Sequence, residues 1–477
     1  MSSTPWSKHG RAGINKLSHL TQRRLRMLGI DPVRYSWMTA NLGRQLGAVD
    51  ETTTKPYAGR VTSAGGFELA CSYNWRLPPA PAPRDPRLAR MKNREGRIRL
   101  LPSLARQTPQ IFVPGEAPGV VFHELPLSFA PNRRLSSCRD FNTAYMPESP
   151  FQAMFRAIEV MRPGLKLDDV DVIINRSNLS HLLRVARGRC SKPYRLELSM
   201  IRNSLLVTPK WPVLHESHRN NYGRLFEEHF TRHTTDMSEA GSHHRAILYN
   251  LGPLRCLVLM EVDAAFTELE PSWASPNWRL PQTEQNLMTS IQHEQVQAAH
   301  EQQISMQSDA ERRLFQSLLN DENNGNGDDG DKFEEAASKK PPSLRPLTLL
   351  RKGGGTLSAH TAELITKTDF QDSDTKTQQM WLGRTPYLIK SLHSLNAFTN
   401  VHVINSWRRL MAFEERSQEN LQKLVSALQM LREITSGTAD RHAIGICTQQ
   451  SRSLKVFTPQ ETPRPSLPLD IKKRFWT

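Results

Sequence analysis

Cysteine is scarce in this sequence. The chain has 477 residues and five cysteines, which are far apart in the sequence and include no Cys-x-x-Cys pair: Cys71, Cys138, Cys190, Cys256 and Cys447. An odd number of widely separated thiols is not the pattern of a disulfide framework or of a structural zinc site. The cysteines therefore indicate a reducing compartment.

Long apolar runs are also lacking. No stretch approaches the roughly 20 apolar residues that a membrane-spanning helix needs, and no secretory signal is recognisable at the N-terminus. Residues 1–30 instead contain several arginines and lysines and no acidic residue. Such a segment fits a solvated tail, an RNA-binding or nuclear-import arm, or a mitochondrial transit peptide. We expect no membrane association and a nuclear or cytoplasmic location, with the mitochondrion as the alternative.

Basic charge is what the sequence has in excess. Lysine and arginine number 63 against 47 acidic residues, which gives a net charge of +16. This balance favours an anionic partner, most often nucleic acid, although a membrane surface or an acidic protein also fits. The mean hydropathy of −0.55, with 32 prolines and 25 glycines, predicts a folded core diluted by poorly ordered segments.

Helix and strand patterns alternate in the first half of the chain. Apolar residues at helical spacing predict a helix within 149–164 that ends at Pro163-Gly164. The segment "DVDVIIN" (169–175) predicts a strand, and "SNLSHLLRVAR" (177–187) predicts a helix capped by Ser177. This alternation predicts a mixed α/β (α+β) fold with a central mixed sheet flanked by helices.

Two hairpins and a further helix follow. We expect the first hairpin to turn at Arg202-Asn203, a helix near 220–230, and the second hairpin to turn at Leu251-Gly252-Pro253. Later segments at 358–370 and 400–405 have strand patterns.

A long helix is predicted after residue 405, because leucines and a phenylalanine recur near heptad spacing between Leu410 and Leu431. A repeat this short favours packing over the domain's own sheet, with a coiled-coil partner as the alternative.

Changes in composition divide the chain into five parts. Residues 1–60 are predicted to be a basic, disordered arm, and 61–270 the first part of one domain. Residues 271–350 are rich in Gln, Glu, Asn and Asp and are predicted to be a largely disordered, low-complexity insertion. The domain then resumes over 351–455 and is followed by a Pro-rich basic tail over 456–477.

Two carboxylates end one of the apolar strands. In "RCLVLMEVDAAF" (255–266), Glu261 and Asp263 lie two residues apart, so on a strand their side chains point to the same face. Neighbouring carboxylates repel each other, and a hard divalent cation such as Mg²⁺ or Mn²⁺ relieves that repulsion. Both groups could instead be solvated where the strand ends. Glu363 and Lys367, in a second strand-like segment, add the carboxylate and lysine that are typical of metal-dependent nucleases.

Other short motifs fit their usual chemistry poorly. The histidines of "HESH" (215–218) and "SHHR" (242–245) lack metalloprotease spacing, so ordinary polar roles are favoured over zinc ligation. The glycines of "RKGGGT" (351–356) lack the Gly-Lys-Ser/Thr ending of a phosphate-binding loop.

Four short blocks between residues 173 and 386 form a set. The first, "IINRSNLSHLL" (173–183), places Arg176 at the position of a motif arginine. The second, "YGRLFEE", matches a Gly-x-x-Phe-Glu block and places Glu227 at its acidic position. The third is Glu261-Val262-Asp263, and the fourth, "QMWLGRTP" (379–386), contains Gln379. In sequence and in order, these four blocks resemble the DXO family of decapping and RNA 5′-end quality-control nucleases.

The chain departs from the family pattern in two places. Where the family has Glu-Leu-Lys, this chain reads Glu363-Leu364-Ile365, and a lysine follows only at Lys367. Because residues two apart share a strand face, Lys367 could take the place of the family lysine, a question that the sequence leaves open. About 100 residues also separate Asp263 from Glu363, which an insertion looped out of the domain explains, because the entropic cost of closing a loop grows slowly with its length.

The resemblance implies a nuclease-like domain that hydrolyses RNA 5′ ends with Mg²⁺ or Mn²⁺, as a decapping enzyme, pyrophosphohydrolase or 5′–3′ exoribonuclease. Its implied metal ligands are Glu227, Glu261, Asp263 and Glu363. Lys367 would assist catalysis, while Arg176 and Gln379 would bind substrate. The altered lysine motif supports an alternative, a catalytically degenerate relative that binds RNA or a protein partner without turnover. A protein partner could bind the disordered segments in either case.

Overall fold

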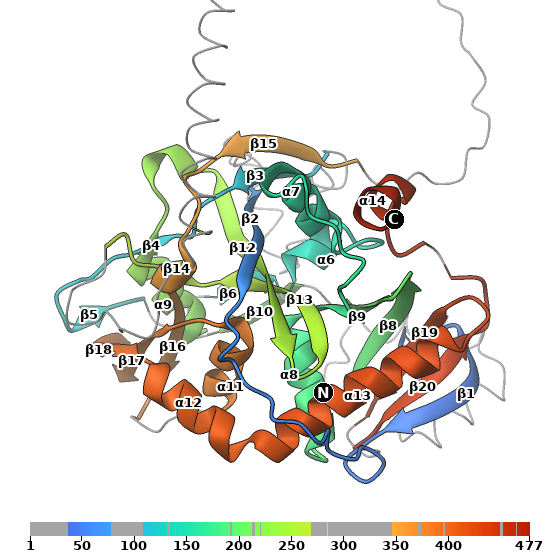
Figure 1. The fold of residues 1–477 in the computed structure, drawn as a ribbon. Helices are drawn as coiled ribbons and strands as arrows, with labels where there is room; N and C mark the ends of the chain where they lie inside the picture. The colour runs from blue at the N-terminus through green and yellow to red at the C-terminus, as the bar shows by residue number, and fades with distance from the viewer. Residues whose placement is uncertain are drawn as a thin grey trace, which may run out of the picture.

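The computed structural model describes residues 37–77, 108–130, 134–138, 140–190, 193–211, 215–219, 221–268, 284, 346–369, 374–394, 396–448, 452–463 and 465–477. These residues form two large sheets flanked by helices (Figure 1). The predicted mixed α/β class is confirmed. The predicted basic arm before residue 37 lies outside the described residues.

The larger sheet has eleven strands and contains both parallel and antiparallel pairs. In spatial order they are β1 (Leu42–Val49), β20 (Leu454–Pro459), β19 (His442–Cys447), β8 (Tyr194–Ile201), β9 (Ser204–Lys210), β7 (Val172–Asn175), β13 (Leu254–Val262), β12 (Ala240–Leu251), β2 (Glu68–Arg76), β3 (Gln110–Pro114) and β15 (Thr348–Lys352). The central strands are buried on both faces, which explains why β7 and β13 read as continuous apolar runs in the sequence.

The second sheet has seven strands. In spatial order they are β11 (Thr231–Arg232), β4 (Gly119–Val120), β14 (Ala264–Ala265), β16 (Thr361–Lys367), β17 (Tyr387–Ser394), β18 (Ala397–Asn405) and β5 (Leu127–Ser128). A separate ribbon pairs β6 (Arg134–Cys138) with β10 (His215–Arg219). The two large sheets are joined where β13 of the first continues through Asp263 into β14 of the second.

Both predicted hairpins are confirmed. The β8–β9 hairpin turns at Arg202-Asn203, and the β12–β13 hairpin turns at Gly252-Pro253. Gly252 has a φ of +58°, a left-handed conformation that glycine adopts without the steric cost of a Cβ atom. β12 and β13 keep an unbroken antiparallel register, which fixes where β13 delivers Glu261.

Helices cover the large sheet. They include α6 (Phe141–Tyr145), α7 (Gln152–Met161), α8 (Arg176–Ala186) and α13 (Gln418–Ser436), while α9 (Tyr222–Phe230) packs against β16 of the second sheet. The predicted helices within 149–164 and near 220–230 are confirmed as α7 and α9. α8 is confirmed with one correction: Asn175, rather than Ser177, is the N-cap, and its side chain accepts a hydrogen bond from the backbone N–H of Asn178.

The predicted long helix is two helices, α12 (Trp407–Arg416) and α13, which are separated at Ser417. α13 packs on α8 and on strands β8, β19 and β1, and its leucines at 421, 424, 428 and 431 are fully buried there (Figure 1). The heptad-like spacing therefore serves packing on the domain's own sheet, as predicted.

Both ends of the described chain belong to the domain. β1 pairs with β20, so the domain begins before residue 61, where the arm was predicted to end. The predicted tail over 456–477 is also wrong, because α14 (Leu469–Phe475) packs against the body of the domain. Ile471, Phe475 and Trp476 are buried, and Trp476 donates a hydrogen bond from Nε1 to Ser204 Oγ over 3.0 Å. A high proline content masked this helix in the sequence.

Most of the predicted insertion lies outside the described residues, with two exceptions. β15 begins at Thr348 and pairs in parallel with β3, so the second part of the domain begins before residue 351. Glu284 is buried, and its carboxylate accepts a hydrogen bond from the backbone N–H of Ser358 over 2.7 Å. At least these points of 271–350 are built into the domain. Within the described residues, no helix is both long and apolar enough to cross a membrane.

Candidate active site

Three predicted acidic residues meet where the two sheets join. Glu261 lies near the end of β13 and Asp263 directly follows that strand. β14 pairs antiparallel with β16, with Ala264 opposite Ala362, and this register brings Asp263 to the level of Glu363. Asp263 also accepts a hydrogen bond from the backbone N–H of Leu364 over 3.0 Å. The fold thus closes the separation of about 100 residues.

Glu363 is the most deeply buried of these carboxylates. Its surface is 1% exposed, and it forms ion pairs with Arg176 and with Lys376. Burial alone would raise the pKa of Glu363, but these two cations outweigh burial and lower that pKa to about 2. Glu363 is therefore a permanent negative charge with two fixed partners.

Lys376 is the functional candidate that the sequence reasoning missed. It lies in the first turn of α11 (Asp374–Gly383), and its Nζ is 2.5 Å from Glu363 Oε2 and 3.5 Å from Asp263 Oδ2. Burial lowers the pKa of Lys376, but the carboxylates of Glu363 and Asp263 outweigh burial and raise it. Lys376 therefore keeps its positive charge.

Lys367 is not brought into this network. It ends β16 with its side chain partly exposed, and it forms no ion pair with any carboxylate that the structure describes. Ile365, at the position of the family lysine, packs at the edge of the main core. The signal that could have identified Lys376 is its helical spacing to Gln379, since residues three apart share a helix face.

Glu261 lies between two cavities. The first, the Trp211 cavity, has a volume of ≈430 Å³ and is also lined by Arg176, His181, Arg184 and Trp211. The second, the Glu227 cavity, has a volume of ≈410 Å³. It is lined by charged residues that include Arg224, Glu227, Glu261 and Asp263.

The position of Glu261 raises its pKa. Its side chain is exposed toward these cavities, and among the described residues it has no ion-pair partner. Desolvation by the surrounding protein, followed by the negative charges of Asp263 and Glu227, raises the pKa of Glu261 to about 8. Among the described carboxylates of this site, Glu261 is therefore the one without a cationic partner.

Glu227 faces the same cavity from α9. It forms an ion pair with Arg224 over 3.0 Å, one turn earlier on that helix. Desolvation and the negative charge of Asp263 raise the pKa of Glu227 to about 6, although Arg224 and Lys376 act in the opposite direction. The site therefore holds three carboxylates whose negative charges interact, those of Glu227, Glu261 and Asp263.

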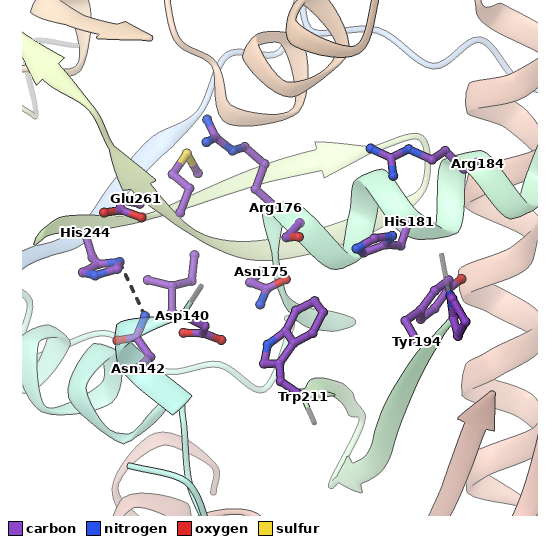
Figure 2. Close-up of a pocket in the computed structure, with 14 residues that line it drawn as sticks. Asp140, Asn142, Asn175, Arg176, His181, Arg184, Tyr194, Trp211, His244 and Glu261 are labelled. Carbon is purple, nitrogen blue, oxygen red and sulfur yellow. Dashed lines mark hydrogen bonds between the residues drawn. The ribbon is translucent and has the colours of Figure 1, made fainter. Parts of the chain in front are cut away.

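Arg176 occupies the first position of α8 and reaches across to the second sheet. A Cβ atom built on Gly383 would lie 3.1 Å from Cδ and from Nη1 of Arg176, so a glycine at this place leaves room for the guanidinium group. Arg176 also borders the Trp211 cavity, where Figure 2 shows it between Glu261 and the axis of α8. One arginine thus contacts the buried carboxylate and faces an open space.

Gln379 lies one turn after Lys376 on α11 and is half-buried. It does not line either cavity. The structure therefore brings Arg176, Glu261, Asp263 and Glu363 together, places Glu227 across the second cavity, and leaves Gln379 at the margin.

The chemistry of this cluster suits a hard divalent cation, because crowded carboxylates with raised pKa values are stabilised by positive charge. Among the described residues, however, no three His, Cys, Asp or Glu side chains are placed closely enough to hold a metal ion together. Arg176 and Lys376 instead supply the positive charge at Glu363. Metal binding would require side-chain movement, most simply of Glu261 and Glu227, which face open cavities.

Comparison with known proteins identifies a family. The model of a domain of unknown function, DUF8563, matches residues 103–320 and 348–476. The chain belongs to the DUF8563 family. The family match passes over 321–347, within the predicted insertion. No curated protein matches the sequence.

Solved structures of Rai1 and Dxo1, which are DXO-family proteins, are similar to this chain over most of its length. Rai1 from Candida albicans in complex with pU5-Mn²⁺ has 10% identity and a TM-score of 0.45, with 90% of this chain and 98% of that chain covered. Rai1 from Scheffersomyces stipitis has 9% identity and a TM-score of 0.44, with coverage of 87% and 99%. Dxo1 from K. lactis in complex with manganese has 8% identity and a TM-score of 0.38, with coverage of 90% and 98%.

Proposed function

We propose that this protein is a divalent-metal-dependent hydrolase that acts on RNA 5′ ends. One observation carries the proposal: separate segments converge where the two sheets join and place Arg176, Asp263, Glu363 and Lys376 in one buried network beside Glu261. Buried charges are costly to desolvate even when they are paired, and clusters with shifted pKa values are typical of active sites. The net charge of +16 supports a polyanionic substrate.

The cation, Mg²⁺ or Mn²⁺, would be held by Glu227, Glu261, Asp263 and Glu363. When bound, it would supply an activated water and polarise the phosphoryl group. Arg176 presents two guanidinium nitrogens, a geometry that suits a phosphate. Lys376 offsets negative charge that develops on the phosphate in the transition state. Gln379, one turn beyond it, orients substrate.

A second candidate function follows from a specific observation. Glu363 is already paired with Arg176 and Lys376, and the described residues contain no assembled metal site. A network neutralised in this way could bind RNA or a protein partner without turnover. The two candidates differ in whether the phosphoester or pyrophosphate bond is broken.

Turnover decides between them. Purified protein is incubated with Mg²⁺ or Mn²⁺ and with RNAs that carry triphosphate, methyl-cap, NAD or monophosphate 5′ ends, and the products are separated by gel and mass spectrometry. We expect cleavage of at least one RNA and a loss of at least about 100-fold in the Glu261→Ala/Asp263→Ala variant, because the carboxylates that hold the cation are removed.

The matched control removes two exposed carboxylates elsewhere, Glu415→Ala/Glu419→Ala on α12 and α13, and should cleave at the wild-type rate. If no RNA is cut, or if the Glu261/Asp263 variant cuts as well as the control, the hydrolase proposal fails and the binding function is favoured.

A further inference from the structure

The Trp211 cavity combines planar rings and basic side chains in a space of ≈430 Å³, a volume typical of small-ligand sites. It opens beside Glu261 and Arg176, so it adjoins the proposed active site (Figure 2).

A polar stripe of α8 forms one wall. Ser177, His181 and Arg184 follow one another at i, i+4 and i+7, and all three line the cavity. The opposite face of the helix, with Leu179, Leu182 and Leu183, is fully buried in the core. The apolar residues fix the rotation of α8, and this rotation points the stripe into the cavity.

Aromatic rings form the second wall. His181 stacks on Tyr194 with ring centroids 4.7 Å apart, and the centroid of Trp211 lies 6.4 Å from that of His181. Trp211 directly follows β9 and is half-buried, so part of its ring faces the open space (Figure 2). Stacking on such rings holds nucleobases with little dependence on sequence.

Positive charge lies at both ends of the wall that α8 forms. Arg176 is paired with Glu363, whereas Arg184 is half-buried and forms no ion pair with any described carboxylate. Asp140 also lines the cavity, but its carboxylate caps α6 through Thr143. Arg184 is therefore the arginine of this wall whose positive charge no described carboxylate neutralises, so it can bind a phosphate.

We propose that the Trp211 cavity binds a nucleotide unit of single-stranded RNA, with its base against Trp211 and His181 and a phosphate at Arg184. The inference rests on the proposed function, because it takes RNA as the substrate whose 5′ end lies near Glu261. The cavity then holds the chain next to the bond that is cleaved.

Binding without turnover tests this assignment. A 3′-fluorescent, 5′-monophosphorylated RNA decamer is titrated with full-length protein in EDTA, and the dissociation constant is measured by fluorescence anisotropy. We expect Trp211→Ala to weaken binding roughly ten-fold and Trp211→Phe, which keeps a ring, to stay within about three-fold of wild type. Arg184→Ala should weaken binding and make it less sensitive to salt, because one phosphate contact is lost.

The charge control is Arg408→Ala, which removes an exposed arginine on α12 that lines neither cavity and should leave binding unchanged. If Trp211→Ala melts at a lower temperature than wild type, His181→Ala provides a second variant that removes ring surface. His181→Ala should also weaken RNA binding roughly ten-fold.

Three results would overturn the assignment: ring-removing variants that bind as tightly as wild type, an Arg408→Ala loss equal to that of Arg184→Ala, or displacement of the RNA by an acidic peptide of equal charge. Because EDTA suppresses metal-dependent cleavage, a failed hydrolase proposal would leave these affinities intact. Conversely, cleavage with an unchanged KM in Trp211→Ala would reject the cavity alone.

Discussion

At the scale of single residues, the lysine next to Glu363 comes from a different part of the chain than the sequence predicted. The sequence predicted a lysine beside Glu363, and the fold supplies Lys376 from α11 rather than Lys367 from the same strand. Spacing along a strand specifies a face but not a distance, and Lys367 lies two further residues along β16 from Ile365. Only tertiary contacts bring the N-terminal turn of α11 over β16.

Replacing each lysine separately distinguishes their contributions. We expect Lys376→Ala to lower kcat by about 100-fold, because it removes positive charge next to Glu363 and Asp263. Lys367→Ala should stay within about two-fold of wild type. Both variants are assayed with the RNA that the wild type cleaves best.

A structural role alone predicts a different pattern. If Lys376 only neutralised Glu363, then Lys376→Ala would lower the melting temperature, and the rate per folded molecule, measured well below that temperature, would stay near wild type. A loss of rate per folded molecule supports the proposed role. Equal rates for the two lysine variants would contradict it.

At the scale of elements, apolar periodicity located the helices and strands that pack on the core, including α7, the β12–β13 hairpin and β16. It failed where a short amphipathic element lies in a segment rich in proline. α14 has only seven residues, too few for a periodic pattern to stand out, and its packing partners are far away in the sequence. For the same reason, the pairing of β1 with β20 could not be read from either strand alone.

Truncating α14 side chains tests whether this helix is part of the core. Phe475 is 1% exposed and lies with its ring centroid 5.2 Å from that of Phe155, so Phe475→Ala should lower the free energy of unfolding by about 3–5 kcal/mol. Leu469→Ala, in the same helix but 67% exposed, should change it by less than about 0.5 kcal/mol. Urea denaturation followed by circular dichroism measures both, and equal effects would show that α14 is not docked in solution.

At the scale of the whole molecule, composition predicted a basic protein with a mixed fold, but it could not predict which charges are buried. His243 and His244 are consecutive residues of β12, and both are buried, with His244 bordering the Trp211 cavity and His243 the Glu227 cavity. Desolvation lowers the pKa of His244 to about 3 and that of His243 well below its usual range. Burial of this kind depends on neighbours such as Tyr73, which stacks on His244 from the adjacent strand, and no local pattern reveals it.

Buried neutral histidines make the stability of the domain depend on pH. The unfolded chain takes up a proton on His244 as the pH falls below about 6.5, whereas the folded chain does so only near 3. The unfolded state therefore binds more protons in this window, and His244 lowers the free energy of unfolding by up to about 1.4 kcal/mol per pH unit as the pH falls. Glu227 and Glu261, whose pKa values are raised, act in the opposite direction, so the pH dependence of the total free energy of unfolding is the sum of opposing contributions.

The difference between wild type and His244→Gln isolates the contribution of this histidine. Measured by urea denaturation from about pH 7.5 to about pH 5, wild type should lose stability relative to the variant only below about pH 6.5. A His244→Gln curve parallel to wild type would mean that His244 is open to water in the folded protein.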